Sequence, residues 1–127
     1  MTRVAYVDTS CIVSIAFGER GAKAVRKRLG EFDELVSSNL LEAELMSAFA
    51  REGVTMDVDM LSSISWVIPD RTLTEEISSV LTAGYVRGAD CWHLATALFL
   101  ADDTAELSFV SLDKHQLKIA GALGFSL

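Results

Sequence analysis

The sequence lacks any apolar run long enough to cross a membrane. Its longest segment without Asp, Glu, Lys or Arg covers the eleven residues 91–101, whereas a membrane-spanning helix needs roughly 20. The segment 1–8 holds too few apolar side chains before its carboxylate to form the core of a signal peptide, which takes about 7–15 residues. We therefore expect a cytoplasmic protein that does not bind membranes.

Cysteine is scarce, and positive charge is in the minority. The two cysteines, Cys11 and Cys91, lie in apolar segments without CxxC spacing, which favours buried thiols over a disulfide. The 127 residues carry 18 acidic and 11 basic side chains, a net charge of −7. Proteins that clamp bulk nucleic acid usually show the opposite balance. The placement of the carboxylates therefore has to explain the acidity.

What the sequence does contain is a regular alternation of apolar strand-like and helix-like segments. Half of the residues are hydrophobic, enough for the core of a single domain over 1–127. The patterns predict strands at 3–7, 35–38, 64–68 and 107–112, with a last short strand at 125–127. They predict helices at 11–17, 19–29, 40–51, 73–83, 89–101 and 114–123, with a short helix from residue 59. This alternation favours an α/β sandwich around a mainly parallel sheet.

Four acidic residues fall where such a sheet would gather them. Asp8 ends the first apolar strand and Asp113 ends the last long one, so both should face the carboxyl edge of the sheet, where ligands bind. Asp90 opens a helix after the turn at Gly88, and Glu44 lies in the first two turns of another helix. We expect these four carboxylates to meet in one cleft.

A cleft of four carboxylates requires a positive counter-charge. Like charges in a low-dielectric cleft repel one another, and burial raises the pKa of each acid unless a cation is present. An all-oxygen ligand set without a Cys or His pair suits Mg²⁺ or Mn²⁺ better than zinc. Mg²⁺ held by a few carboxylates commonly serves phosphate chemistry. The pattern therefore predicts a divalent-metal site for a phosphoryl substrate.

Each acid also has a purely structural interpretation when taken singly. An Asp before a helix is a common N-cap, and Glu44 on a helix that also carries Glu42 suits a solvated face. The hydroxyls beside the acids, Thr9 among them, suit turns. We interpret His93 as a packed helix residue, because a metal-assisted reaction needs no histidine base. Only the conjunction of the four acids favours a site.

In ordered segments around the four acids, the sequence resembles the PIN domain, in particular the small single-domain ribonucleases of the VapC type, which are the toxins of type II toxin–antitoxin pairs. The resemblance extends over almost the whole chain, and the segment around Asp90 is the most distinctive. The matching segments are Tyr6-Val7-Asp8-Thr9-Ser10, Ser38-Asn39-Leu40-Leu41-Glu42-Ala43-Glu44-Leu45, Arg87-Gly88-Ala89-Asp90-Cys91-Trp92-His93-Leu94-Ala95-Thr96-Ala97 and Phe109-Val110-Ser111-Leu112-Asp113-Lys114.

The resemblance implies a fold, an activity and partners. It implies a three-layer α/β/α sandwich and cleavage of RNA by an Mg²⁺- or Mn²⁺-dependent endoribonuclease, leaving a 5′-phosphate and a 3′-hydroxyl. It also implies a cognate antitoxin protein, and we expect a homodimer. The implied catalytic and metal-site residues are Asp8, Glu44, Asp90 and Asp113, with Ser10 and Ser111 as supporting hydroxyls.

Contacts with RNA are assigned from charge and position. Arg87 and Lys114 each lie close in sequence to a proposed metal acid and are our candidates for contacting a phosphate. The basic segment 20–28 presents several cations on one helical face. That face suits either an RNA backbone or solvent, with Glu19 and Glu31 as ion-pair partners.

Two other functions remain as alternatives. A phosphatase of the haloacid-dehalogenase kind also has an Asp after its first strand, but it needs a second acid two residues later, where this chain has Ser10. A catalytically inactive PIN-like module that binds RNA or protein would normally have lost an acid, and all four are present. No GxGxxG or GxxxxGK[ST] string supports nucleotide binding.

Overall fold

The chain folds around a four-stranded parallel sheet. The computed structural model describes residues 2–127, apart from the side chain at position 58. The strands are β1 (Val4–Val7), β2 (Glu34–Ser38), β3 (Ile64–Val67) and β4 (Leu107–Val110), and they lie in the order β3-β2-β1-β4. Each neighbouring pair is parallel. The carboxyl ends of all four strands therefore lie at the same edge.

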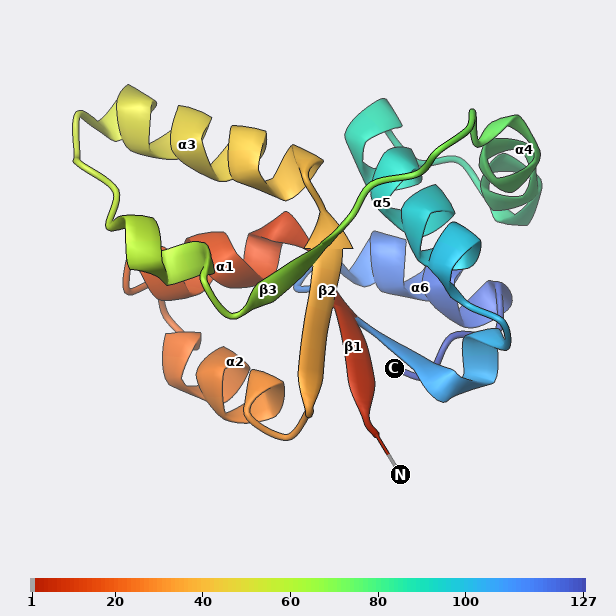
Figure 1. The fold of residues 1–127 in the computed structure, drawn as a ribbon, viewed down its shortest axis with the longest axis horizontal. Coiled ribbons are helices and arrows are strands. Elements are labelled where there is room, and N and C mark those ends of the chain that lie inside the picture. The colour runs from red at the N-terminus through yellow and green to blue at the C-terminus, as the bar shows by residue number, and fades with distance from the viewer. Residues whose placement is uncertain (1) are drawn as a thin grey trace.

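Helices cover both faces of this sheet (Figure 1). One layer contains α1 (Thr9–Ala16), α2 (Ala22–Leu29) and α3 (Leu40–Glu52), and the other contains α4 (Thr74–Ala83), α5 (Gly88–Leu100) and α6 (Lys114–Ala122). Two short 3-10 helices, η1 (Val58–Leu61) and η2 (Thr104–Glu106), precede β3 and β4. The predicted three-layer α/β/α sandwich with a parallel sheet is confirmed.

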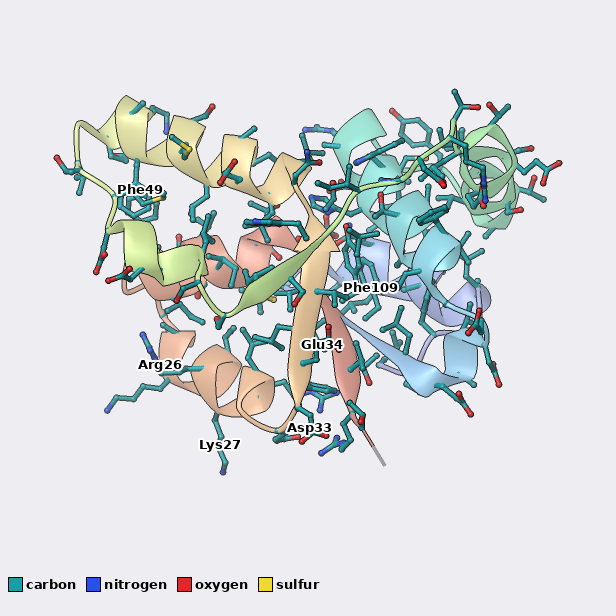
Figure 2. The ribbon with its side chains drawn as sticks, viewed as in Figure 1. Arg26, Lys27, Asp33, Glu34, Phe49 and Phe109 are labelled. Atoms are coloured by element: carbon teal, nitrogen blue, oxygen red, sulfur yellow. The ribbon has the colours of Figure 1, made fainter. Side chains whose placement is uncertain are left out.

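The core lies on both sides of β1, because successive side chains of a strand point to opposite faces. Ala5 and Val7 pack against α1 and α3, whereas Tyr6 faces the other layer and stacks on Phe109 with 5.4 Å between ring centroids. Figure 2 shows Phe49 of α3 and Phe109 of β4 on opposite sides of the sheet. A parallel sheet covered on both faces carries nearly continuous apolar strands, as β1 does.

Several element boundaries differ from the predicted ones. The predicted strand at 125–127 is a single parallel bridge between Ser108 and Ser126. Strand β4 ends at Val110, three residues before Asp113, and α5 begins at Gly88, which puts Asp90 inside its first turn. The short helix near residue 59 is a 3-10 turn. Apolar runs mark strands well but mark their last residues poorly, because the turn that follows also contains apolar side chains.

The two cysteines are buried, as expected, and free. None of the described helices is long and apolar enough to span a membrane.

Candidate active site at the carboxyl edge of the sheet

Asp8 lies at the centre of this edge, directly after β1. Its backbone N–H donates to the carbonyl of Val110 at 2.9 Å, which continues the pairing of β1 with β4 by one residue. Its side chain caps α1, since Oδ2 accepts from the backbone N–H of Ser10 at 3.0 Å. The predicted capping role of Asp8 is therefore real. Asp8 is only 5% exposed, and such burial is unusual for an Asp that serves only as a cap.

Glu44 reaches the same edge from the second turn of α3. Its Oε1 accepts hydrogen bonds from Thr9 Oγ1 at 2.8 Å and from His93 Nε2 at 2.9 Å. The His93 hydrogen bond, assisted by that of Thr9, lowers the pKa of Glu44. The neighbouring Glu42 is exposed. The geometry therefore favours Glu44 over Glu42 as the acid of α3 that faces the carboxyl edge.

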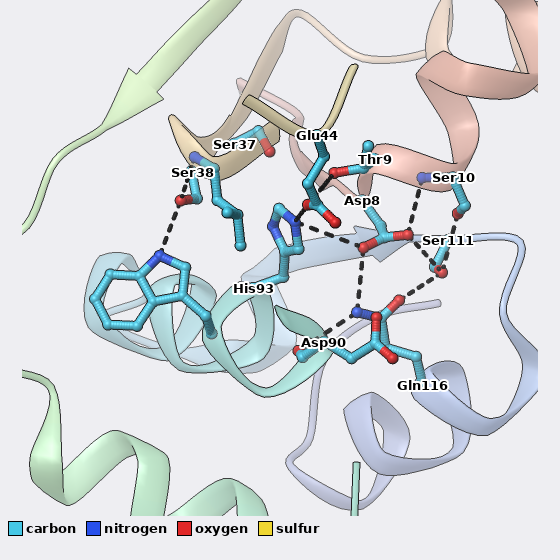
Figure 3. A network of polar contacts seen from close by, with 12 residues as sticks. Asp8, Thr9, Ser10, Ser37, Ser38, Glu44, Asp90, His93, Ser111 and Gln116 are labelled. Atoms are coloured by element: carbon cyan, nitrogen blue, oxygen red, sulfur yellow. Dashed lines mark hydrogen bonds and ion pairs between the residues drawn. The ribbon is translucent and has the colours of Figure 1, made fainter. Parts of the chain in front are cut away.

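His93 connects Glu44 to the interior of the sheet (Figure 3). The ring is 1% exposed, and Nδ1 lies 2.7 Å from the hydroxyl of Tyr6. Nε2 donates to Glu44, because a carboxylate has no hydrogen to give, and it lies 4.0 Å from Asp8 Oδ1. The Tyr6 hydroxyl in turn accepts from the backbone N–H of Ser38 at 3.0 Å. Buried polar groups thus run without a break from β2 to the carboxylates.

Asp90 lies in the first turn of α5, partly exposed beside these groups. Burial raises its pKa, and the negative charges of Asp8, Asp113 and Glu44 raise it further, against an opposing effect of His93. All three other predicted acids therefore lie close enough to affect the charge of Asp90. The tertiary fold brings the four acids into one electrostatic neighbourhood.

Asp113 and Ser111 occupy the turn between β4 and α6. Asp113 is the N-cap of α6, and its Oδ1 accepts from the backbone N–H groups of His115 and Gln116 at 2.9 and 3.2 Å. The Ser111 hydroxyl accepts from the Asp113 N–H at 3.0 Å and lies 3.4 Å from Asp8 Oδ2. Ser10 Oγ accepts from the N–H of Leu112 at 3.1 Å. Both predicted hydroxyls thus lie beside Asp8 and fix the local backbone.

The chemistry of this edge fits a divalent cation, while the side chains do not yet surround one point. Carboxylate oxygens are hard ligands that suit Mg²⁺ or Mn²⁺, and a cation would relieve the repulsion at Asp90. Within residues 2–127, no three acidic, His or Cys side chains converge closely enough to hold a metal ion as they stand.

The candidate phosphate contacts differ in position. Arg87 directly precedes α5, the helix that carries Asp90, and Lys114 is the first residue of α6, the helix that Asp113 caps. Both basic side chains are exposed. The cations of α2 lie elsewhere: Figure 2 shows Arg26 and Lys27 pointing outward, on the side of the sheet where β2 begins. Arg28 pairs with Glu31 at 3.0 Å. For this end of α2, the solvated-face interpretation agrees better with the structure.

Three side chains of the network are not singled out by the sequence as site residues. His93 is buried as predicted, yet it also bonds to Glu44, and Thr9 is more than a turn residue. Gln116, which is fully buried, donates to Asp8 Oδ1 at 3.2 Å. One signal was available for Gln116: it lies three residues after Asp113, on the turn of α6 that faces back toward the strand end.

A parallel α/β/α sandwich with buried and partly buried acids at its carboxyl edge defines a class of proteins whose ligand site lies where the strands end. The sequence matches the PIN domain family over residues 5–122, nearly the whole chain. The protein belongs to this family, whose members are generally nucleases. A search of curated proteins finds no match.

Proposed function

We propose that this protein is a divalent-metal-dependent endoribonuclease that hydrolyses RNA phosphodiester bonds. The observation that carries the proposal is the arrangement of the carboxyl edge of a PIN domain, where Asp8 is 5% exposed, Glu44 is held by His93 at 2.9 Å, and the negative charges of Asp8, Asp113 and Glu44 act on Asp90. Such crowding costs free energy in the isolated protein unless a cation is bound. Natural proteins tolerate unfavourable arrangements of this kind mainly at functional sites.

In this proposal the four acids hold Mg²⁺ or Mn²⁺, and neighbouring residues prepare them. The bound ion supplies positive charge against the phosphate oxygens and lowers the pKa of a water molecule. Thr9 and His93 fix Glu44 through hydrogen bonds at 2.8 and 2.9 Å, which keeps this carboxylate ionised. Arg87 and Lys114 contribute exposed positive charge at the ends of α5 and α6, where they would contact the RNA backbone.

The test is cleavage of single-stranded RNA by the purified protein. We expect cleavage with Mg²⁺ or Mn²⁺, loss of cleavage with a chelator, recovery on adding the metal back, and products with a 5′-phosphate. Asp90→Asn should abolish cleavage while its circular dichroism spectrum matches that of the wild type. Chelator-resistant cleavage that survives Asp90→Asn would contradict the proposal.

We further propose that the protein is the toxin of a toxin–antitoxin pair, acts in the cytoplasm and forms a homodimer. The support is the ordered resemblance to VapC-type toxins. Leu81 and Tyr85, which are 46% and 76% exposed, provide apolar surface that a protein contact would cover. Expression should arrest growth, and co-expression of a small protein from the adjacent reading frame should relieve the arrest. Harmless expression with all four acids intact would rule out the toxin role. The homodimer is tested separately, because sedimentation of the purified chain measures its mass in solution.

A further inference from the structure

Gln116 is a buried residue of α6 that forms hydrogen bonds with three of the four acidic residues, Asp8, Asp90 and Asp113. It is 0% exposed, and its amide lies among three groups from three different elements (Figure 3). Nε2 is 3.2 Å from Asp8 Oδ1 and 3.5 Å from the carbonyl oxygen of Asp90, whereas Oε1 is 2.6 Å from Ser111 Oγ. One uncharged side chain thus connects the end of β1, the first turn of α5 and the end of β4.

The chemistry of these neighbours determines which way the amide points. The carboxylate of Asp8 and the carbonyl of Asp90 only accept hydrogen bonds, so the amide nitrogen must face them. The amide oxygen then faces Ser111, whose hydroxyl has a single hydrogen to donate. That hydrogen goes to Gln116 at 2.6 Å, because the alternative acceptor, Asp8 Oδ2, is 3.4 Å away.

Gln116 is itself held in place by the turn that carries Asp113. Its backbone N–H donates to Asp113 Oδ1 at 3.2 Å, and the Asp113 N–H donates to Ser111 Oγ at 3.0 Å. Ser111, Asp113 and Gln116 therefore form a closed ring of hydrogen bonds. Gln116 is fixed at both its backbone N–H and its amide oxygen, so the two N–H groups of its amide nitrogen point toward Asp8 Oδ1 and the carbonyl of Asp90.

We propose that Gln116 is a positioning residue, which fixes the direction of the Asp8 carboxylate and ties it to the first turn of α5, where Asp90 lies. The proposal deepens the proposed function and rests on it. Ser10 N–H holds one oxygen of Asp8 and Gln116 holds the other. An amide suits this place because it is neutral: it occupies a lone pair without repelling Asp8, as an acid would, or cancelling its charge, as a lysine would.

A positioning role and a merely structural role predict different results when the amide is removed. Loss of a buried hydrogen-bonding group lowers the stability of any protein. A residue that only stabilises the fold would leave the folded fraction with unchanged metal affinity. A residue that orients a metal ligand changes the affinity for the ion itself, typically by about 10–100-fold.

The experiment compares Gln116→Met with Leu117→Met. Both variants place methionine on α6, but only Gln116→Met removes the amide. Leu117 is the control position, because it lines a separate apolar pocket together with Cys11 and Leu112. Binding of Mn²⁺ is measured by electron paramagnetic resonance without RNA, and cleavage is measured over a range of Mn²⁺ concentrations. Gln116→Met should bind Mn²⁺ about 10–100-fold more weakly and recover most of its rate at saturating Mn²⁺. Leu117→Met should match the wild type.

The outcomes separate this inference from the proposed function. A wild-type protein that neither binds Mn²⁺ nor cleaves RNA refutes the proposed function and this inference with it. A functional wild type with unchanged Mn²⁺ affinity in Gln116→Met overturns the positioning role alone. Should Gln116→Met fail to fold, Gln116→Asn decides, because the shorter side chain draws the amide nitrogen away from Asp8 Oδ1 and leaves the Ser111 hydroxyl and its bond with the Asp113 N–H in place. A several-fold weaker Mn²⁺ affinity in Gln116→Asn supports the role, and an unchanged affinity overturns it.

Discussion

The two edges of the sheet both carry acidic residues, but their surroundings differ. At the amino edge, Asp33 accepts from the backbone N–H of Arg3 at 2.7 Å and Asp103 caps η2, and both are exposed. Figure 2 shows Asp33 at this end of the sheet, where β2 begins. At the carboxyl edge, Asp8 is 5% exposed and contacts side chains from other parts of the chain.

The comparison teaches that the number of acids does not mark a site. An exposed carboxylate keeps its hydration, so its charge changes the folding free energy little and interacts weakly with neighbouring groups. A buried carboxylate must exchange water for protein donors, and its charge then acts strongly on its neighbours. The raised pKa of Asp90 is the consequence at one edge. The net charge of −7 therefore arises partly from solvated surface carboxylates and partly from the carboxylates gathered at the carboxyl edge.

The largest expected difference between the two edges is in activity. Asp8→Asn removes a proposed metal ligand and should lower RNA cleavage by more than about 100-fold. Asp33→Asn, the matched change at the amino edge, should cleave RNA at the wild-type rate, because Asp33 is exposed and its carboxylate accepts from the backbone N–H of Arg3, far from the site. Initial rates under saturating Mg²⁺ measure both. Equal losses in the two variants would erase the functional distinction between the edges.

The second difference is stabilisation by metal. A ligand that binds only the folded state adds about 2.7 kcal/mol at 100 times its Kd. Thermal unfolding of the wild type should therefore shift upward with Mn²⁺. Asp103→Asn should show the same shift, since its cap on η2 is remote from the site, whereas Asp90→Asn should show little. A full shift in Asp90→Asn would remove this carboxylate from the metal site.

The third difference is stability without metal. Burial and three negative neighbours disfavour the charged form of Asp90, so Asp90→Asn should raise the metal-free melting temperature by roughly 2–5 °C. Asp103→Asn keeps the cap and should leave the melting temperature unchanged. Calorimetry in a chelating buffer measures both. A lower melting temperature for Asp90→Asn would mean that its charge is already compensated in the metal-free protein.

The last prediction concerns alkaline stability and the buried Cys11 thiol, on which the charge of Asp8 acts. Burial, with the charge of Asp8 adding to it, raises the pKa of the Cys11 thiol from 9.0 to about 12. The folded protein therefore keeps a proton that the unfolded chain loses above pH 9, and stability should fall as pH rises from 9 toward 12. Cys11→Ala should make this fall shallower in urea titrations. An identical slope in the variant would show that Cys11 is not responsible.

Much of the fold is already visible in the sequence, because it depends on local pattern. The apolar run before Asp8 is a strand since Val, Ala and Tyr alternate between two buried faces, and the strong helix formers of 40–51 form a helix as expected. Strand β4 ends two residues before the predicted end, and α5 begins one residue before the predicted start. The end of β4 depends on a hydrogen bond to a distant residue, the one from the Asp8 N–H to the carbonyl of Val110.

Only part of the site can be predicted from local sequence pattern. Asp8, Glu44, Asp90 and Asp113 follow from their positions at strand and helix ends, because parallel strands bring their carboxyl ends to one edge. His93 and Gln116 carry no such signal. His93 becomes a partner of Glu44, and Gln116 a partner of Asp8, through contacts that span 49 and 108 residues of chain. Local sequence pattern cannot encode which donor faces which acceptor at that separation.

The sequence by itself determined the alternation of strands and helices, the membership of the PIN family and the four acids near strand and helix ends, since each of these features depends on short segments of the chain. Only the tertiary structure decided which of the 18 acids are buried, which donors hold them, and that the basic end of α2 points away from them. The physical reason is that burial and hydrogen-bond direction belong to the packed molecule. A carboxylate has the same chemistry at both edges of the sheet until its neighbours replace its water.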